Sequence, residues 1–259
     1  MLRLEGVGKV FKAGTFGGER ITAVDDVSFD IQPGEVVSLI GESGSGKSSI
    51  GKMILRLLDA SAGSIVFEDR DVATLNGRAL RRYYASVQGV FQDPFSSYNP
   101  VFKADRVFGL VRRPFLPHLS DAEWKERLHS SLRAVGLEPA AVLGKYPHQL
   151  SGGQLQRLLI ARALMLDLKL LVADEIISML DASTRIDVLN ILGDLKSRGL
   201  GVLFITHDLS LGHYISDRTV ILRRGRVVEH GATERVFSEP QDAYTKLLLE
   251  SVPKLDARW

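Results

Sequence analysis

The segment EVVSLIGESGSGKSSIGKMILRLL, residues 35–58, constrains the fold more than any other part of the sequence. It starts as an apolar strand at residues 36–40 and passes through a glycine-rich turn into a helix, where apolar residues recur at helical spacing at Ile50, Met53, Ile54, Leu57 and Leu58. The turn matches the pattern G-x-x-x-x-G-K-[ST] through Gly41, Gly46, Lys47 and Ser48. Such glycines let successive backbone N–H groups point into one concavity, where the positive end of the helix dipole also lies. The sequence therefore predicts a strand, loop and helix that together bind phosphate.

The residue types of this turn suit a magnesium-bound nucleotide. Lys47 can reach the β- and γ-phosphates, and the Ser48 hydroxyl can ligate Mg²⁺. A flexible loop rich in glycine and serine is the competing interpretation, which the strand before the turn and the helix after it disfavour. We expect contacts to the nucleotide from Gly41, Ser43, Gly44, Ser45, Gly46, Lys47, Ser48 and Ser49.

A second chemical signal is the pair of adjacent carboxylates in LLVADEIISMLD, residues 170–181. The apolar run before them is typical of a strand buried in a parallel sheet, whose carboxyl end would deliver Asp174 to the metal. Glu175 lies one residue further on and could act as the general base for the attacking water. The pair could instead cap the next helix, which Asp181 or Ser183 would otherwise begin and which Gly199 would end. Kinases, GTPases and DNA motors all remain open at this point.

The stretch YPHQLSGGQLQRLLIARALM, residues 146–165, narrows these classes. Ser151 is typical of a helix N-cap, and the two glycines after it would expose the first helix amides as a second anion-binding surface. The motif LSGGQ resembles the signature of the ATP-binding cassette family. In that family this helix start faces the ATP held by the other subunit of a head-to-tail dimer. The resemblance implies ATP contacts from Ser151, Gly152, Gly153 and Gln154.

Other residues match this family one by one. Gln92 in VFQDP falls where the family places a glutamine that touches Mg²⁺ and the attacking water, and His207 in VLFITHD resembles its switch histidine. Phe11 resembles the aromatic residue that stacks on adenine. Asp181, in SMLD, belongs to the segment that signals across the dimer, and the resemblance implies that it contacts ATP. The resemblance thus implies the catalytic residues Glu175, His207 and Gln92, the metal ligands Ser48, Gln92 and Asp174, and the cofactors ATP and Mg²⁺.

The fold class that follows is α/β: a P-loop NTPase core of the RecA-like kind, with an N-terminal antiparallel β subdomain and an inserted α-helical subdomain. We expect a single nucleotide-binding domain over residues 1–259, with the antiparallel sheet ending near residue 70 and a strand hairpin around VILRRGRVVEHG. The helical insertion should cover about 93–167 and end in the LSGGQ helix. A C-terminal tail is expected at about 232–259.

Two segments place the chain within the family. Both segments resemble ATPase subunits of oligopeptide, dipeptide and nickel importers. The first is the stretch QDPFSSYNP. The second is the tail SEPQDAYTKLLLESVPKLD, where the resemblance lies in Pro240, Tyr244, Thr245, Leu248 and Pro253. The resemblance implies an ATPase that powers uptake of oligopeptides, dipeptides or a related solute. A sugar-oligomer or nickel importer and a non-transport or regulatory ATPase are the alternatives. The transported solute is not readable from the sequence.

The implied partners are a homologous ATPase subunit, two transmembrane permease subunits and, indirectly, an extracytoplasmic solute-binding protein. By resemblance, a heterodimer is favoured over a homodimer, and the lack of a C-terminal cysteine cluster and the short tail fit the second of the two paired ATPase subunits. The expected location is peripheral, on the cytoplasmic face of the cell membrane. The sequence opens MLRLEGVGKV with no signal-peptide pattern and contains no run of 18 uncharged apolar residues, so we expect any membrane connection to run through a partner.

Composition excludes further classes. The formal net charge is +2, which gives no strong field for nucleic acid, and we expect no nucleic-acid partner. The absence of cysteine excludes disulfides, thiolate metal sites and cysteine-ligated iron–sulfur clusters.

One departure from the family pattern follows Glu175. Relatives commonly read E-P-T-S-A-L-D, whereas this chain reads EIISMLD. Ile176 keeps the N–H and the free φ that proline lacks, and Ile177 replaces a hydroxyl with apolar bulk. We expect a less constrained turn, with an effect on the hydrolysis rate that the sequence leaves open. These two residues are the only support for a catalytically silent, regulatory cassette.

Overall fold

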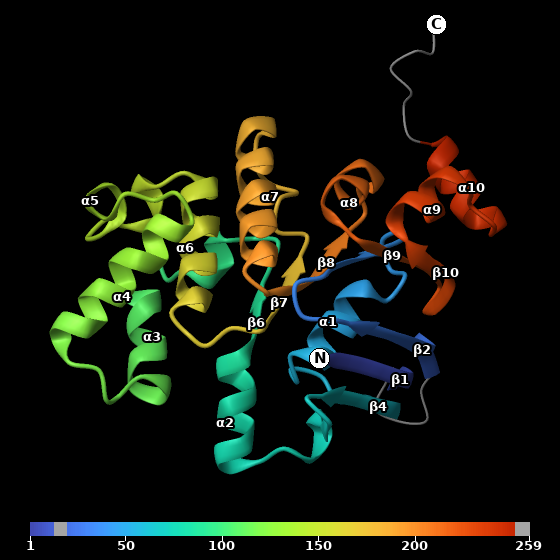
Figure 1. Cartoon of the computed structure of the whole chain (residues 1–259), viewed down its shortest axis with the longest axis horizontal. Helices are drawn as coiled ribbons and strands as arrows, with labels where there is room; N and C mark the ends of the chain where they lie inside the picture. Colours follow the sequence, from blue (N-terminus) through green and yellow to red (C-terminus); the bar gives the residue numbers. More distant parts are fainter. Residues whose placement is uncertain (13–19, 252–259) are drawn as a thin grey trace, which may run out of the picture. The chain divides into compact units, whose positions relative to one another are not determined.

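The computed structural model describes residues 1–12 and 20–251 of the chain, so Pro253 and the end of the predicted tail lie outside the described residues. The chain divides into two compact units, Met1–Asn76 with Gly201–Trp259, and Gly77–Leu200. Figure 1 follows the chain through both. Among the described residues, no helix combines the length and apolar character needed to cross a membrane.

The first unit contains an antiparallel sheet in the strand order β2-β1-β4-β5 (Figure 1). Its strands are β1 (Leu2–Lys12), β2 (Arg20–Ile31), β4 (Ala62–Phe67) and β5 (Arg70–Asp71), followed by a short 3₁₀ turn, Val72–Thr74. Buried and exposed residues alternate along β1 and β2, as expected for strands with one face on a core. The predicted N-terminal antiparallel sheet, ending near residue 70, is confirmed.

The same unit contains the parallel strands that carry the P-loop. Strand β3 (Val36–Ile40) pairs in parallel with β8 (Gly201–Thr206) on one side and with β9 (Arg218–Arg223) on the other. All five residues of β3 are buried, which is typical of a central strand covered on both faces. Strand β9 turns back into β10 (Arg226–Ala232), which confirms the predicted hairpin. The helices of this unit are α1 (Lys47–Ile54), α8 (Leu209–Ile215), α9 (Thr233–Ser238) and α10 (Ala243–Glu250).

Helix α1 is shorter than the sequence pattern predicts. The apolar spacing extends to Leu58, but α1 ends at Ile54, and Leu57 is 63% exposed. Arg56 adopts a left-handed backbone with φ 53°, and its N–H and that of Leu57 bond back to Met53 and Lys52 at 3.0 and 2.8 Å. These paired bonds form a Schellman C-cap, which terminates a helix whatever the apolar period beyond it.

The second unit combines two parallel strands with most of the helices. Strands β6 (Val87–Val90) and β7 (Leu170–Asp174) pair in parallel. The helices are α2 (Gly77–Ser86), α3 (Arg106–Phe115), α4 (Asp121–Ala134), α5 (Pro139–Val142), α6 (Gly152–Leu164) and α7 (Ala182–Ser197), with 3₁₀ turns at Phe95–Ser97 and Pro147–Gln149. Helices α3 to α6 fall inside the range predicted for the helical insertion, and the unit also takes in β6, β7 and α7.

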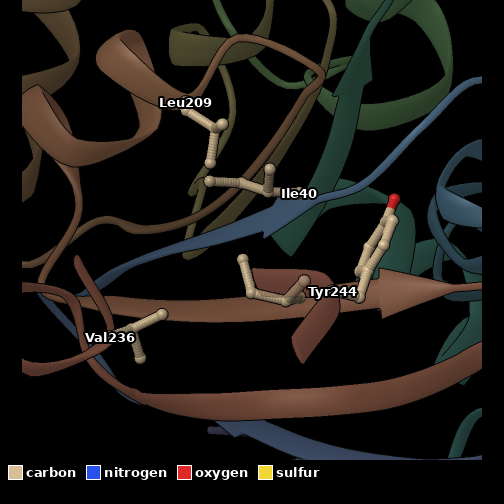
Figure 2. Close-up of a cluster of buried hydrophobic side chains, with 5 residues drawn as sticks. Ile40, Leu209, Val236 and Tyr244 are labelled. Carbon is tan, nitrogen blue, oxygen red and sulfur yellow. The ribbon is translucent and has the colours of Figure 1, made fainter. Parts of the chain in front are cut away.

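A small apolar cluster of the first unit packs the C-terminal helices against the end of β3. It consists of Ile40, Leu209, Ile221, Val236 and Tyr244, all buried. Figure 2 shows Leu209 and Ile40 side by side, and Tyr244 with its hydroxyl at the upper end of the ring. This cluster fixes α8, α9 and α10 to the strand that leads into the P-loop.

Candidate functional site

The P-loop backbone follows β3 through a turn with no room for larger residues at two glycines. A Cβ at Gly41 would lie 2.1 Å from the carbonyl oxygen of Leu222, and one at Gly46 would lie 2.4 Å from that of Ala23. Gly46 also has φ 106°, a left-handed conformation that side chains disfavour. At Gly44 a Cβ would meet open space, so the loop is packed on one side and open on the other.

Lys47 lies at the start of α1 and holds the loop closed. Its ammonium donates to the carbonyl oxygens of Gly41 at 2.6 Å and Glu42 at 2.9 Å, and the residue is only 5% exposed. The first turn of α1, all of it described, has neither a side-chain cap nor an acidic residue. Among the described residues, the buried Ser45 hydroxyl has no hydrogen-bond partner. A buried cation, an uncapped helix start and an unpaired hydroxyl are the donor set that fits a phosphate group.

His207 lies at the same edge of the parallel strands as the P-loop. Thr206, the last residue of β8, is opposite Ile40, the last residue of β3, so His207 and Gly41 continue from neighbouring strand ends. His207 is exposed, and the next residue, Asp208, caps α8 by accepting the N–H groups of Ser210 and Leu211 at 2.9 and 3.2 Å. The carboxyl edge of a parallel sheet is where such folds bind ligands.

Phe11 lies at the end of β1 and is 39% exposed, so its ring does not belong to the core. It is opposite Ile21 on β2, and the ammonium of Lys9 lies 5.3 Å from its ring centroid. The backbone of β2 also backs the P-loop, at Ala23, against Gly46. Strand β2 therefore contacts both regions, since Ile21 is opposite Phe11 and Ala23, two residues further along, contacts the P-loop.

In the second unit, Asp174 and Gln92 follow neighbouring strand ends. Val90, at the end of β6, is opposite Ala173 on β7. Gln92 comes two residues after Val90, and Asp174 comes one residue after Ala173. Asp174 is buried, whereas Gln92 is exposed. The strand predicted from LKLLVAD thus ends at the carboxylate, as the sequence indicates.

Glu175 adopts an unusual backbone conformation. Its φ is 51°, in the left-handed region, which costs a residue with a Cβ about 1–2 kcal/mol. The turn is held because the carbonyl oxygen of Glu175 accepts the N–H and the hydroxyl of Ser178 at 3.1 and 2.9 Å. Ile176 and Ile177 are 1% and 2% exposed. The turn expected to be looser without proline is therefore constrained by burial of both isoleucines, and its strained residue is the predicted base.

The LSGGQ helix, α6, begins with a complete capping box. The Ser151 hydroxyl accepts the N–H of Gln154 at 3.2 Å, and the Gln154 side chain accepts the N–H of Ser151 at 2.9 Å. Ser151 is therefore the N-cap predicted from the sequence, and Gln154 is committed to the cap as well.

Helix α7 begins beside the start of α6. A Cβ at Gly153 would lie 2.3 Å from Cγ2 of Thr184, so α6 and α7 meet in close contact at this glycine. Asp181 caps α7 and accepts the Ser183 hydroxyl at 2.6 Å and the Thr184 N–H and hydroxyl at 3.0 and 2.8 Å. These hydrogen bonds, that of Ser183 first, lower the pKa of Asp181 well below its usual range, so it stays ionised at neutral pH.

Three long-range hydrogen bonds tie α6 to the segment around Gln92, and sequence reasoning missed the residues that make them. The Tyr98 hydroxyl donates to Leu155 O at 2.8 Å, the Gln156 amide donates to Phe91 O at 3.2 Å, and the Arg162 guanidinium donates to Gly89 O at 3.5 Å. Burial raises the pKa of Tyr98 and lowers that of Arg162. Gln156 is fully buried one turn past the glycines, and a buried glutamine needs a hydrogen-bond partner, but only the fold reveals this burial.

The predicted site residues thus form two groups. The first unit holds Phe11, His207 and the P-loop, and the second holds Gln92, Ser151, Gly152, Gly153, Gln154, Asp174, Glu175 and Asp181. No group of three or more His, Cys, Asp or Glu side chains able to hold a metal gathers among the described residues. The oxygen donors Ser48, Gln92 and Asp174 have the chemistry that Mg²⁺ prefers, and their metal role stays a prediction.

Comparison with known proteins places these features in context. The profile of the ABC transporter family matches residues 24–178. A putative peptide import ATP-binding protein of Brucella abortus is 45% identical over 235 residues, which is 90% of this chain and 73% of the relative. The dipeptide transport ATP-binding protein DppF of Lactococcus lactis is 41% identical over 266 residues, 99% of this chain and 82% of the relative.

Solved structures agree with these sequence relatives. A dimeric ATP-binding cassette in a post-hydrolysis state, bound to ADP and Pi, has a TM-score of 0.79 at 29% identity, covering 90% of this chain and 99% of the other. The cassette cbiO1 of Clostridium perfringens, part of an ABC transporter complex, has a TM-score of 0.78 at 26% identity, covering 92% and 90%.

Proposed function

The chain belongs to the ABC transporter family and is an ATPase, and we propose that it hydrolyses ATP to power the uptake of peptides through membrane-spanning partner subunits. The observation that carries the nucleotide part is the P-loop, where buried Lys47 bridges two loop carbonyls at an uncapped helix start. The relatives named for peptide and dipeptide transport support the choice of solute.

The phosphates and the adenine of ATP would be bound by residues of the first unit. The phosphates would meet the amides at the start of α1 and the ammonium of Lys47, which exchanges its carbonyl partners for phosphate oxygens. Phe11 would present its exposed ring to the adenine. Mg²⁺, held by Ser48, Asp174 and Gln92, would offset the negative charge of the phosphates.

Hydrolysis uses Glu175 as the base. Its carboxylate takes a proton from water as the water oxygen bonds to the γ-phosphorus, and the bond from that phosphorus to the β,γ-bridging oxygen breaks to release ADP and phosphate. His207 would hydrogen-bond the γ-phosphate, and Gln92 would hold the water. The strained backbone of Glu175, fixed by Ser178, supports this assignment because it fixes the Cα–Cβ bond from which the side chain extends.

A dimer is part of the proposal. The start of α1 at Lys47 and the start of α6 after Ser151 lie on separate units of one chain, and we assign the second to the ATP of a partner subunit. The natural partner is a homologous ATPase in a heterodimer, with both subunits on two permease subunits at the cytoplasmic face of the membrane. A solute-binding protein would deliver the peptide from outside.

The test combines turnover with transport. Glu175→Gln should keep ATP affinity, stop hydrolysis and accumulate an ATP-bound dimer, because the amide keeps the shape but accepts no proton. Glu138→Gln, at an exposed glutamate outside the site, is the matched control and should hydrolyse ATP like the wild type. In cells lacking the chain, the wild type and the control should restore uptake of a labelled dipeptide and Glu175→Gln should not. Hydrolysis by Glu175→Gln at the wild-type rate would show that Glu175 is not the base. If the wild-type chain hydrolyses ATP but does not restore dipeptide uptake, peptides are not the solute.

A further inference from the structure

Tyr244 connects the C-terminal helix α10 with the P-loop. Its ring is 3% exposed and packs in the cluster with Ile40, the residue that leads into the loop (Figure 2). Its hydroxyl accepts the backbone N–H of Glu42 at 3.3 Å. The guanidinium of Arg223 lies 4.7 Å from the ring centroid. The ring thus anchors α10 in the core, and the hydroxyl reaches the loop.

The position of Tyr244 is fixed from the other side by β10. The Glu229 carboxylate on β10 accepts the N–H groups of Gln241 and Asp242 at 2.8 and 3.1 Å, just before α10 begins. Burial opposes ionisation of Glu229, but these backbone hydrogen bonds prevail and lower its pKa. Asp242 then caps α10 by accepting the N–H of Tyr244 itself at 2.7 Å. Because the helix start is bonded to the sheet, the Tyr244 hydroxyl has little freedom to follow the loop.

Glu42, the residue that Tyr244 holds, also receives the bonds that close the P-loop. Its carbonyl oxygen accepts the Lys47 ammonium at 2.9 Å and the N–H of Ser45 at 3.1 Å. The N–H and the C=O of this one residue are therefore held by different side chains, the N–H by Tyr244 and the C=O by Lys47. Displacing the Glu42 backbone would displace an acceptor of the lysine that meets the phosphates.

We propose that Tyr244 is a positioning residue of the nucleotide site, whose hydroxyl fixes Glu42 and through it Lys47, so that docking of α10 sets the affinity for the phosphates. This inference rests on the proposed binding of ATP at the P-loop. The apolar cluster alone does not require a hydroxyl, since phenylalanine would fill the same space. What only tyrosine supplies is the acceptor for the Glu42 N–H.

The experiment compares two Tyr→Phe variants of the full chain. Tyr244→Phe removes the hydroxyl and keeps the ring, and Tyr214→Phe makes the same change at a ring that is 59% exposed on α8 of the same unit. Dissociation constants for ATP and for ADP are measured by calorimetry, and hydrogen exchange of the Glu42 amide is measured without nucleotide. A net hydrogen bond corresponds to about a 2- to 10-fold change, so Tyr244→Phe should weaken ATP and ADP by a similar factor in this range. Its Glu42 amide should exchange faster, while Tyr214→Phe changes neither quantity.

The outcomes separate this inference from the proposed function. A wild-type chain that does not bind ATP would refute the proposed function. If the wild type binds ATP and Tyr244→Phe binds it equally well, the positioning role is refuted, whether or not the Glu42 amide exchanges faster. A lower melting temperature of Tyr244→Phe with unchanged dissociation constants would show a merely structural hydroxyl and would also overturn the proposal.

Discussion

The contact between the starts of α6 and α7 gives a prediction whose size follows from the structure. A methyl group added by Gly153→Ala would lie 2.3 Å from Cγ2 of Thr184, well inside van der Waals contact, whereas the other near atoms of Thr184 lie at 3.5 Å. Overpacking of this kind costs about 1–3 kcal/mol. Alanine returns at most about 1 kcal/mol of helix propensity. We expect Gly153→Ala to lower the free energy of unfolding by up to about 2 kcal/mol, which is what remains of the overpacking cost after the full gain in helix propensity.

A second substitution should rescue the first. Thr184→Ser deletes the obstructing Cγ2 and keeps the hydroxyl that Asp181 accepts at 2.8 Å. Alone it should cost no more than about 0.8 kcal/mol, the value of one buried methylene, because Thr184 is only half-buried. In the double variant the overlap is gone, so the two single losses should fail to add by about 1–3 kcal/mol.

Urea unfolding of the wild type, both single variants and the double variant measures this coupling. Gly152→Ala is the control, because its methyl group would meet Leu180 and Phe95 at 3.7 and 3.9 Å, ordinary contact distances, and stability should stay within about 0.5 kcal/mol. If the free energy of unfolding of the double variant falls by the sum of the two single-variant losses, Gly153 does not contact Thr184. The close packing of the LSGGQ helix on α7 would then be refuted.

Three further predictions concern the site itself. Phe11→Ala should weaken ATP and GTP by similar factors, about 2- to 10-fold by titration, because stacking recognises the ring face rather than the hydrogen-bonding edge, and unchanged affinity would remove Phe11 from the site. Ile176→Pro with Ile177→Thr should keep ATP affinity but lower the melting temperature, because burying the threonine hydroxyl costs about 1–3 kcal/mol. An unchanged melting curve would contradict the burial of position 177. Mixing Lys47→Ala chains with Ser151→Arg chains should restore no ATP hydrolysis if the natural partner is a different subunit, whereas restored hydrolysis would indicate a homodimer.

The parts of the fold that the sequence predicted are those set by local chemistry. The strands at 36–40 and 170–174 match because a mainly apolar run that ends at glycine or at a carboxylate has few other solutions in a parallel sheet. Ser151 was identified as a helix cap, and Asp181 as one of two candidates with Ser183, because a cap is made within three residues of the chain. The end of α1 was missed because the apolar spacing continues past Arg56, and periodicity does not report a left-handed backbone.

The contacts that position the site residues are non-local and could not be predicted in this way. Tyr98 meets the carbonyl of Leu155 from 57 positions away, and Tyr244 meets the amide of Glu42 from 202 positions away. Both tyrosines occur in segments used above only to place the chain within its family. A residue pattern identifies chemical groups that act at a site, whereas the partner that orients a backbone amide depends on which element the fold brings beside it.

The turn after Glu175 shows how an inference from one residue can miss a constraint that the fold supplies. Without proline, Ile176 has a free φ in an isolated chain, and a looser turn was the natural expectation. In the folded chain Ile176 and Ile177 are almost completely buried, and together their side chains would lose several kcal/mol of apolar burial if the turn opened. That exceeds the 1–2 kcal/mol cost of the left-handed Glu175. Burial therefore replaces the rigidity of proline in holding the proposed base, so the departure from the family pattern does not by itself argue for a silent cassette.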